Sequence, residues 1–188
     1  MTALRVSLRV PHRVLEREGS GLHDFLKTVE DAGMDGVCVG DHVSFRDGTG
    51  YDGLVHATAL AIASRRLDVW TAVYLLGLRH PVLVARQVSS LAALAPGRFV
   101  FGVGLGGDDR REFEVCGIDP RRRGRRFDAC LDTVRALLAG EEVTLDDHDV
   151  RVPGAVIRPV PHPPVPIIVG GRSSAALQRA ARAADGWI

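Results

Sequence analysis

Cysteine is scarce in this sequence, and the few cysteines are placed where they exclude a disulfide scaffold. The 188 residues include 3 cysteines, Cys38, Cys116 and Cys130, which stand far apart and form no CxxC pair. Their odd number leaves one thiol unpaired in any disulfide scheme. This usage fits a reducing compartment, and we expect a cytoplasmic protein.

Long hydrophobic runs and an excess of charge of one sign are also missing. No apolar stretch approaches the ~18 residues that indicate a membrane span, and the first residues lead into a strand pattern without the features of a signal peptide. The formal net charge is +1, and Lys27 is the only lysine. Such a balance creates no field that would attract nucleic acid or an anionic membrane. We therefore expect a small-molecule substrate and neither of those partners.

Histidines are present, but not in a pattern that predicts a metal site. His12, His23, His56, His148 and His162 have neither the spacing of metal ligands nor an evident partner in the sequence. We expect no bound metal.

The sequence does contain strand and helix patterns in regular alternation. Apolar residues alternate from Leu4 to Val10, and a helical pattern over 22–29 leads to the short apolar run Val37–Gly40. Further helices are predicted over 54–62, 81–94, 127–138 and 173–184, and further strands over 67–73, 99–103, 167–169 and from Gly186. Serial units of this kind imply a parallel sheet with right-handed crossovers.

Two architectures accept this pattern, an open doubly wound sheet and a closed (β/α)₈ barrel. A complete barrel typically has ~250 residues, so a chain of 188 residues holds about five to six βα units of one. We expect a single domain over residues 1–188. A hairpin and a proline-rich connection are predicted within 141–166.

Functional groups of parallel α/β proteins gather at the carboxyl ends of the strands. Asp41 and His42 follow the second predicted strand, where they could act as a general acid/base pair or a proton relay. The alternative is that His42, as a histidine at a strand end, is simply hydrogen-bonded. The run Gly170-Gly171-Arg172-Ser173 joins a strand to a helix N-terminus, which suits a phosphate. The alternative is that Ser173 or Ser174 merely caps that helix.

Glycines also follow the fourth predicted strand. Gly102, Gly104 and Gly107 satisfy G-x-G-x-x-G, but an arginine-rich stretch follows, and no acidic residue stands after a second strand as a dinucleotide site requires. We therefore disfavour a Rossmann site. The glycines either let backbone N–H groups approach a ligand closely or give a barrel strand the room it needs.

The order of several short motifs resembles a known family. The motifs are Val39-Gly40-Asp41-His42, Arg79-His80-Pro81, Gly97-Arg98-Phe99 leading into Gly102–Gly106, Arg111-Glu112-Phe113, Gly170-Gly171-Arg172-Ser173 and Asp185-Gly186-Trp187. In this order they resemble the luciferase-like monooxygenase family, especially its coenzyme F420-dependent oxidoreductases. The resemblance runs from the first strand to Ile188 and implies a (β/α)₈ TIM barrel of the bacterial-luciferase type that is incomplete, being truncated at its C-terminus.

The resemblance also implies a cofactor and residues that hold it. A flavin or deazaflavin would lie at the carboxyl ends of the strands, with coenzyme F420 favoured and FMN as the alternative. Ala72-Val73 would form a non-prolyl cis peptide against the ring. Leu105, Gly106 and Gly107 would lie along the cofactor, and Gly170, Gly171, Arg172 and Ser173 would face its phosphate.

By the same resemblance, Asp41 and His42 would border the reactive face of the ring, where His42 would supply or remove a proton while hydride moves. The family's sugar-phosphate dehydrogenases carry a tryptophan and a carboxylate at positions that correspond here to Arg46 and Gly107. These departures argue against that particular activity.

Two alternatives to F420-dependent hydride transfer stay open from the sequence. One is a monooxygenase that uses reduced FMN from a separate reductase. The other is a truncated, non-catalytic protein stabilised by self-association, since an open parallel sheet exposes an apolar edge. In either enzyme we expect a homo-oligomer, with a dimer favoured.

Overall fold

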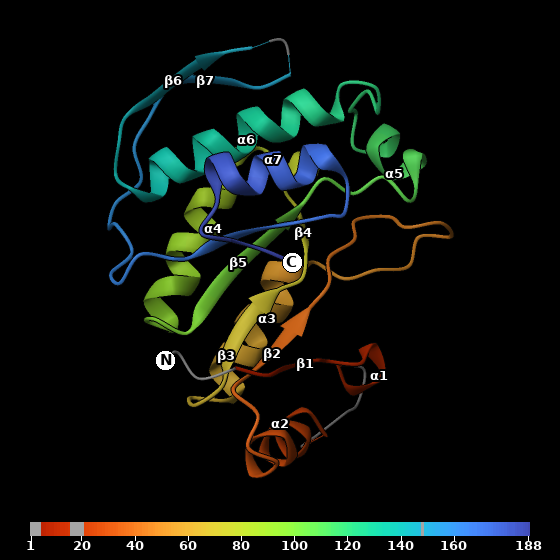
Figure 1. Cartoon of the computed structure of the whole chain (residues 1–188), viewed down its shortest axis with the longest axis vertical. Coiled ribbons are helices and arrows are strands. Elements are labelled where there is room, and N and C mark those ends of the chain that lie inside the picture. The colour runs from red at the N-terminus through yellow and green to blue at the C-terminus, as the bar shows by residue number, and fades with distance from the viewer. Residues whose placement is uncertain (1–4, 16–20, 148) are drawn as a thin grey trace.

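The computed structural model describes residues 5–15, 21–147 and 149–188 and has alternating strands and helices (Figure 1). Leu4 and His148, which belong to predicted segments, lie outside these residues. In chain order the elements are β1 (Ser7–Arg9), α1 (His12–Leu15), α2 (Gly21–Asp31), β2 (Gly36–Val39), α3 (Gly53–Ala63), β3 (Asp68–Thr71), β4 (Tyr74–Leu75), the 3₁₀ helix η1 (Leu76–Leu78), α4 (Pro81–Leu94), β5 (Phe99–Gly104), α5 (Arg110–Val115), α6 (Arg123–Leu138), β6 (Val143–Asp146), β7 (Arg151–Ala155), β8 (Ile167–Gly170), α7 (Ser174–Ala183) and β9 (Gly186–Trp187).

The main sheet is parallel throughout the described chain. Its strands lie in the order β1-β2-β3-β5-β8-β9, and the short β4 pairs with the end of β5. In the register, Val37 faces Val69, Val69 faces Phe99, and Ile168 faces Gly186. Sequential strands that neighbour one another are the arrangement of a barrel wall rather than of a doubly wound sheet, whose order reverses at a switch point. The barrel prediction is confirmed, and the sheet is open between β1 and β9.

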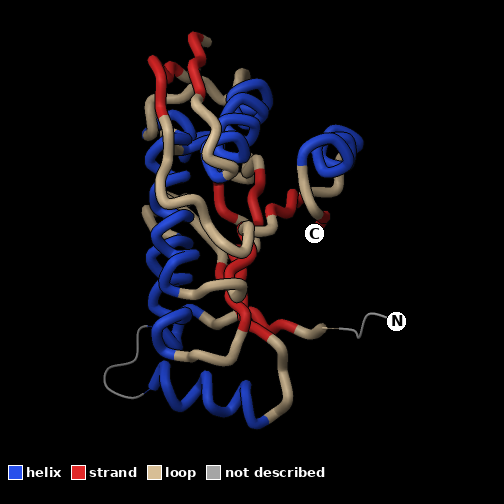
Figure 2. The backbone as a smooth tube through the Cα atoms, turned by 90° about the vertical axis from the view of Figure 1, so that its left-hand side faces the viewer, coloured by secondary structure: helices blue, strands red, loops and turns tan. Residues whose placement is uncertain are grey.

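The hydrophobic core lies between the sheet and its helices. Val37, Val69, Phe101 and Val103 are fully buried on strands, and they pack in one cluster with side chains from α3, α4 and α6. Helices stand along one side of the strands in Figure 2, and the other side is bare of helix over most of its length in the part of the chain that the structure describes. No helix among those residues is both long and apolar enough to cross a membrane.

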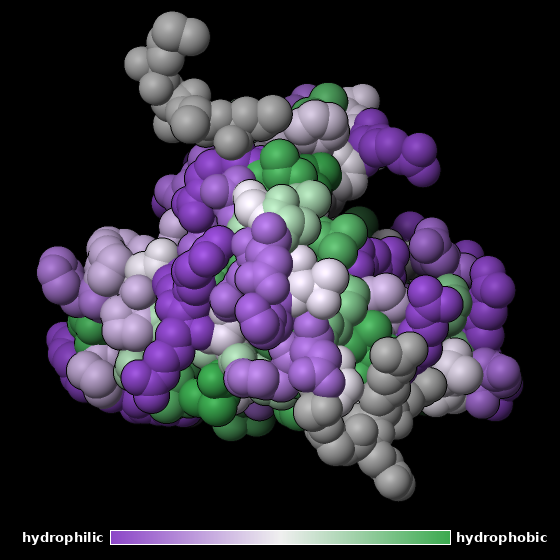
Figure 3. All heavy atoms as spheres, turned by 90° about the horizontal axis from the view of Figure 1, so that it is seen from below, coloured by the Kyte–Doolittle hydropathy of each residue, from purple (hydrophilic) through white to green (hydrophobic). Residues whose placement is uncertain are grey.

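The hairpin predicted within 141–166 forms as β6 and β7, which pair antiparallel above α6 (Figure 1). Seen from below, the end of the molecule where β2 and β3 begin mixes hydrophilic and hydrophobic side chains (Figure 3).

Four short elements were not predicted from the sequence: α1, β4, η1 and α5. Each has 6 residues or fewer, which is too short to show a helical or alternating period. The helix predicted over 127–138 begins earlier, at Arg123, because its first turn consists of arginines and glycine without an apolar stripe. β3 ends at Thr71, two residues before the predicted end.

Candidate functional site

Two adjoining cavities open at the carboxyl ends of the strands. The first has a volume of about 400 Å³ and is lined by Ala72, Val73, Leu105, Gly106, Gly170, Gly171, Arg172 and Ser173, together with side chains of α6 and α7. The second, of about 200 Å³, is lined by Asp41, His42 and Gly107 and shares Ala72, Val73 and Gly106 with the first. The structure therefore brings all the site residues predicted from the sequence to one place, although they come from four separate loops.

The peptide bond between Ala72 and Val73 is cis, as the resemblance implied. The side chain of Val73 lies between the ends of β5 and β8. A Cβ atom on Gly104 would stand 2.3 Å from one γ-methyl of Val73, and a Cβ atom on Gly170 would stand 2.6 Å from the other. Both glycines are therefore required by close packing against Val73, which forms the wall between the two cavities.

Arg172, Ser173 and the start of α7 line the first cavity beside the end of β8. Arg172 is exposed and makes no hydrogen bond or ion pair among the described residues. It precedes the N-terminus of α7, where the helix dipole favours negative charge. The hydroxyl of Ser173 accepts a hydrogen bond from the Ala176 N–H at 3.2 Å. Ser173 thus caps the helix, which was the alternative to phosphate binding, and its position on the cavity wall is compatible with both roles.

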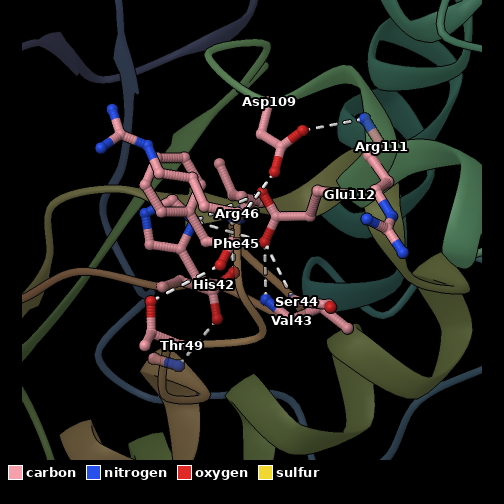
Figure 4. Close-up of polar contacts among 12 residues, drawn as sticks. His42, Val43, Ser44, Phe45, Arg46, Thr49, Asp109, Arg111 and Glu112 are labelled. Atoms are coloured by element: carbon pink, nitrogen blue, oxygen red, sulfur yellow. Dashed lines mark hydrogen bonds and ion pairs between the residues drawn. The ribbon is translucent and has the colours of Figure 1, made fainter.

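His42 is paired with a buried carboxylate. Its Nδ1 atom lies 3.3 Å from each carboxylate oxygen of Glu112, a residue that is only 2% exposed (Figure 4). Oε1 of Glu112 also accepts hydrogen bonds from the backbone N–H groups of Val43 and Ser44, at 2.7 and 3.3 Å. Because an ionised carboxylate only accepts hydrogen bonds, Nδ1 is assigned as the donor, and Nε2 makes no hydrogen bond among the described residues.

The loop after His42 shapes the second cavity. The Phe45 ring lies 4.2 Å, centroid to centroid, from the imidazole of His42, and the Arg46 N–H donates to Asp109 at 2.6 Å (Figure 4). Asp109 in turn caps α5 by accepting from the Arg111 N–H. The His42 loop and the N-terminus of α5 are therefore held as one unit.

Asp41 does not form the expected acid/base pair with His42 in the structure. Its two carboxylate oxygens face Arg79 at 2.6 and 2.8 Å, and they also accept from the Gly53 and Leu75 N–H groups. Burial raises the pKa of the Asp41 carboxyl, while Arg79 and the two N–H groups favour the ionised form. With both oxygens engaged, Asp41 fits a positioning role better than proton transfer, and a catalytic role for it stays a prediction.

Sequence reasoning did not single out Glu112 or Arg79 as site residues. Glu112 lies 70 positions from His42, and Arg79 lies 38 positions from Asp41. Contacts between residues so far apart in the chain leave no periodic pattern in the sequence from which they could be predicted. Both residues stood in the ordered motifs, as Arg111-Glu112-Phe113 and Arg79-His80-Pro81, and a buried acid or base within such a motif was the signal available.

A parallel barrel wall with a cavity at its strand ends defines a class of α/β-barrel proteins. Within that class, residues 9–188 match the family model described as luciferase-like monooxygenase. The match covers nearly all of the sequence, and the chain belongs to the luciferase-like monooxygenase family, an oxidoreductase family.

Named relatives and solved structures agree with this membership. An F420-dependent glucose-6-phosphate dehydrogenase of Beutenbergia cavernae is 36% identical over 164 residues, which cover 85% of this chain and 49% of the relative. The fold is shared with an F420-dependent secondary alcohol dehydrogenase in complex with an F420-acetone adduct, at a TM-score of 0.81 and 20% identity over 97% of this chain and 57% of that one.

The fold is also shared with the oxygenating constituent of 3,6-diketocamphane monooxygenase of Pseudomonas putida in complex with FMN. That comparison has a TM-score of 0.70 and 17% identity over 92% of this chain and 52% of the other. The chain spans about half the length of the curated relatives it matches.

Proposed function

We propose that this chain carries the coenzyme F420 site of an oxidoreductase that transfers hydride to or from a small organic substrate. The observation that carries the proposal is the first cavity, whose lining brings together the Ala72–Val73 peptide, the glycines of β5 and β8, and Arg172 at the start of α7. The F420-dependent relative that is 36% identical over most of the chain supports this choice of cofactor.

The residues present fit a deazaflavin. The wall of the first cavity combines backbone at Gly104, Gly106 and Gly170 with the apolar side chain of Val73, which packs against the glycines at 104 and 170, and a surface of this kind suits an apolar ring face. Arg172, Ser173 and the N-terminus of α7 would hold the phosphate of the cofactor tail. When bound, F420 would supply or accept the hydride.

In this proposal His42 supplies or removes the proton that accompanies the hydride. Glu112 orients the imidazole so that Nε2 is free to face a substrate hydroxyl or carbonyl oxygen in the second cavity. The ring of Phe45 packs against one side of the imidazole and helps to fix its orientation.

The test is a side-by-side titration of the chain with F420 and with FMN, in which the fluorescence of the cofactor reports binding. We expect saturable quenching of F420, and Arg172→Gln should weaken the affinity by about tenfold, because a charge-assisted contact to a phosphate is lost. Arg65→Gln, on an exposed arginine outside both cavities, is the matched control. Saturable binding of FMN alone would contradict the proposal in favour of the FMN monooxygenase, whose cofactor occupies the same fold in the camphane enzyme.

The role of His42 is tested by His42→Gln in turnover of F420 with a panel of small alcohols that includes isopropanol. We expect the rate to fall by roughly 10²–10⁴-fold, the usual contribution of a general acid or base, with F420 affinity unchanged. Glu112→Gln should lower the rate less, because it retains an acceptor for the Val43 N–H. Equal rates in wild type and His42→Gln would contradict the role.

Glucose 6-phosphate is not the substrate that we propose. Where the sugar-phosphate dehydrogenases are expected to carry a tryptophan, Arg46 points its guanidinium over Phe45, 4.9 Å from the ring centroid. Gly107 stands at the expected carboxylate position, against the Arg123 side chain. If the chain binds no cofactor at all, the non-catalytic alternative applies, and light scattering should then show self-association.

A further inference from the structure

A third cavity adjoins the imidazole of His42 on the side away from the proposed cofactor. Its volume is about 580 Å³, and it is lined by Arg9, His12, His42, Phe45 and the loop from Gly48 to Tyr51. Arg9, His42 and Phe45 also line the second cavity, so the two spaces join at these side chains. A molecule in the third cavity would therefore lie against the side chain of His42.

Arg9 stands at this junction, exposed and without a carboxylate partner among the residues that the structure describes. Its guanidinium makes no ion pair or hydrogen bond among the described residues, whereas Arg79, Arg179 and Arg182 are paired with carboxylates. The side chain runs over Gly40, where a Cβ atom would stand 3.2 Å from Nη2 of Arg9. Glycine at position 40 thus leaves room for the guanidinium directly beside His42.

Three acidic residues line the second cavity with Arg9, namely Asp41, Asp108 and Glu112, and none of them forms an ion pair with it. Asp41 is held by Arg79, and Glu112 is held by His42 and two backbone N–H groups. The described lining of the third cavity has no acidic residue, and it contains the aromatic rings of Phe45 and Tyr51, with His12 stacked on Tyr51 at 5.3 Å. An arginine in such surroundings favours a planar anion, because its fork matches a carboxylate in a bidentate geometry.

We propose that Arg9 is a specificity-determining residue and that the substrate is a carboxylate with a planar or aromatic body. Its carboxylate binds the guanidinium of Arg9, and its body lies in the third cavity between Phe45 and Tyr51. The reacting oxygen then faces His42. The reaction of this substrate at His42 rests on the proposed function. Binding of the carboxylate by Arg9 does not depend on it.

The test uses benzoate and its neutral isostere benzamide as probes, titrated calorimetrically into the 188-residue chain without cofactor. We expect benzoate to bind at least about tenfold more tightly than benzamide, since hydrogen bonds to a charged group are the stronger ones. Arg9→Gln should abolish this preference. Arg9→Lys should keep part of it, because lysine retains the charge and loses the bidentate fork.

Arg65→Gln is again the control and should leave the preference intact, and thermal unfolding of each variant confirms that it folds. Equal affinities for the two probes, no binding of benzoate at millimolar concentration, or a preference that survives Arg9→Gln would each overturn the inference. Parallel F420 titrations separate the two proposals, because Arg9→Gln should bind the cofactor as wild type does. Loss of F420 binding with retained benzoate preference would count against the proposed function alone.

Discussion

At the scale of single residues, the wall between the first and second cavities depends on two glycines that leave room for the side chain of Val73. Val73 has space for its two γ-methyl groups only because β5 and β8 each place a glycine beside it. These positions are not explained by unusual backbone angles, since neither Gly104 nor Gly170 has a positive φ. Their requirement is steric, and it can be tested by adding one methyl group.

We predict that Gly170→Ala destabilises the protein by about 1–3 kcal/mol, the usual cost of overpacking. The new methyl would stand 2.6 Å from Val73, and the side chain or the strand must shift. Urea denaturation measures the change. Gly77→Ala is the matched control, because a Cβ atom there would have its nearest neighbour at 4.0 Å. Equal effects of the two substitutions would contradict the packing argument.

At the scale of elements, Arg79 joins segments that are distant in the chain. It binds Asp41 after β2 and Asp52 at the N-cap of α3, and its own backbone carbonyl accepts from Arg126 of α6. The buried pair with Asp41 thus connects the His42 loop to the helices that support it. A buried ion pair of this kind is costly to break at one partner.

Arg79→Met is therefore expected to destabilise the fold by about 3–5 kcal/mol, because Asp41 would remain buried without its counter-ion. Without Arg79, burial raises the pKa of Asp41 further. The unfolded chain loses that proton near pH ~3.9, and the folded chain retains it to higher pH, so the deficit grows as pH rises above about 4.

Urea denaturation at about pH 5 and about pH 8 measures this trend against wild type. The double variant Asp41→Asn with Arg79→Met should lose most of this additional pH dependence, since neither of the two positions then carries a charge. A deficit of Arg79→Met that shrinks with rising pH would contradict the assignment of the buried charge to Asp41.

The elements also show what the sequence could predict. Alternation and apolar spacing located every strand of the main sheet except β4. The central strands β2, β3, β5 and β8 are mostly buried, and the edge strands β1 and β9 show the same apolar pattern although they are exposed. The site was predictable where chemistry follows a strand directly, as at His42 and Gly170. The Glu112 and Arg79 partnerships were not, because they depend on how loops after different strands meet in space.

At the scale of the whole molecule, the sheet has two free edges in the described chain. β1 pairs only with β2, and β9 pairs only with β8. Apolar side chains lie near both edges, with Leu8 41% exposed and Trp187 55% exposed. The central strands β3 and β5 each pair with a neighbouring strand along both edges.

We predict that backbone amides of β1 and β9 exchange hydrogen on the order of tenfold or more faster than those of β3 and β5, because edge strands open locally at lower free energy. Exchange followed by mass spectrometry of peptides gives the comparison. Light scattering on the same sample reports the mass. Slow exchange of the β1 and β9 amides in an assembly would favour the self-association alternative. Slow exchange of the same amides in a monomer would contradict both that alternative and the prediction.

The position of Val73 has one more consequence. One isopropyl group touches Gly104 at the end of β5 and Gly170 at the end of β8, two residues that pair directly in the sheet. Val73 also lines both adjoining cavities, so a side chain added at either glycine would have to move a surface that the two cavities share. A change at one strand end is therefore expected to alter the shape of both spaces at once.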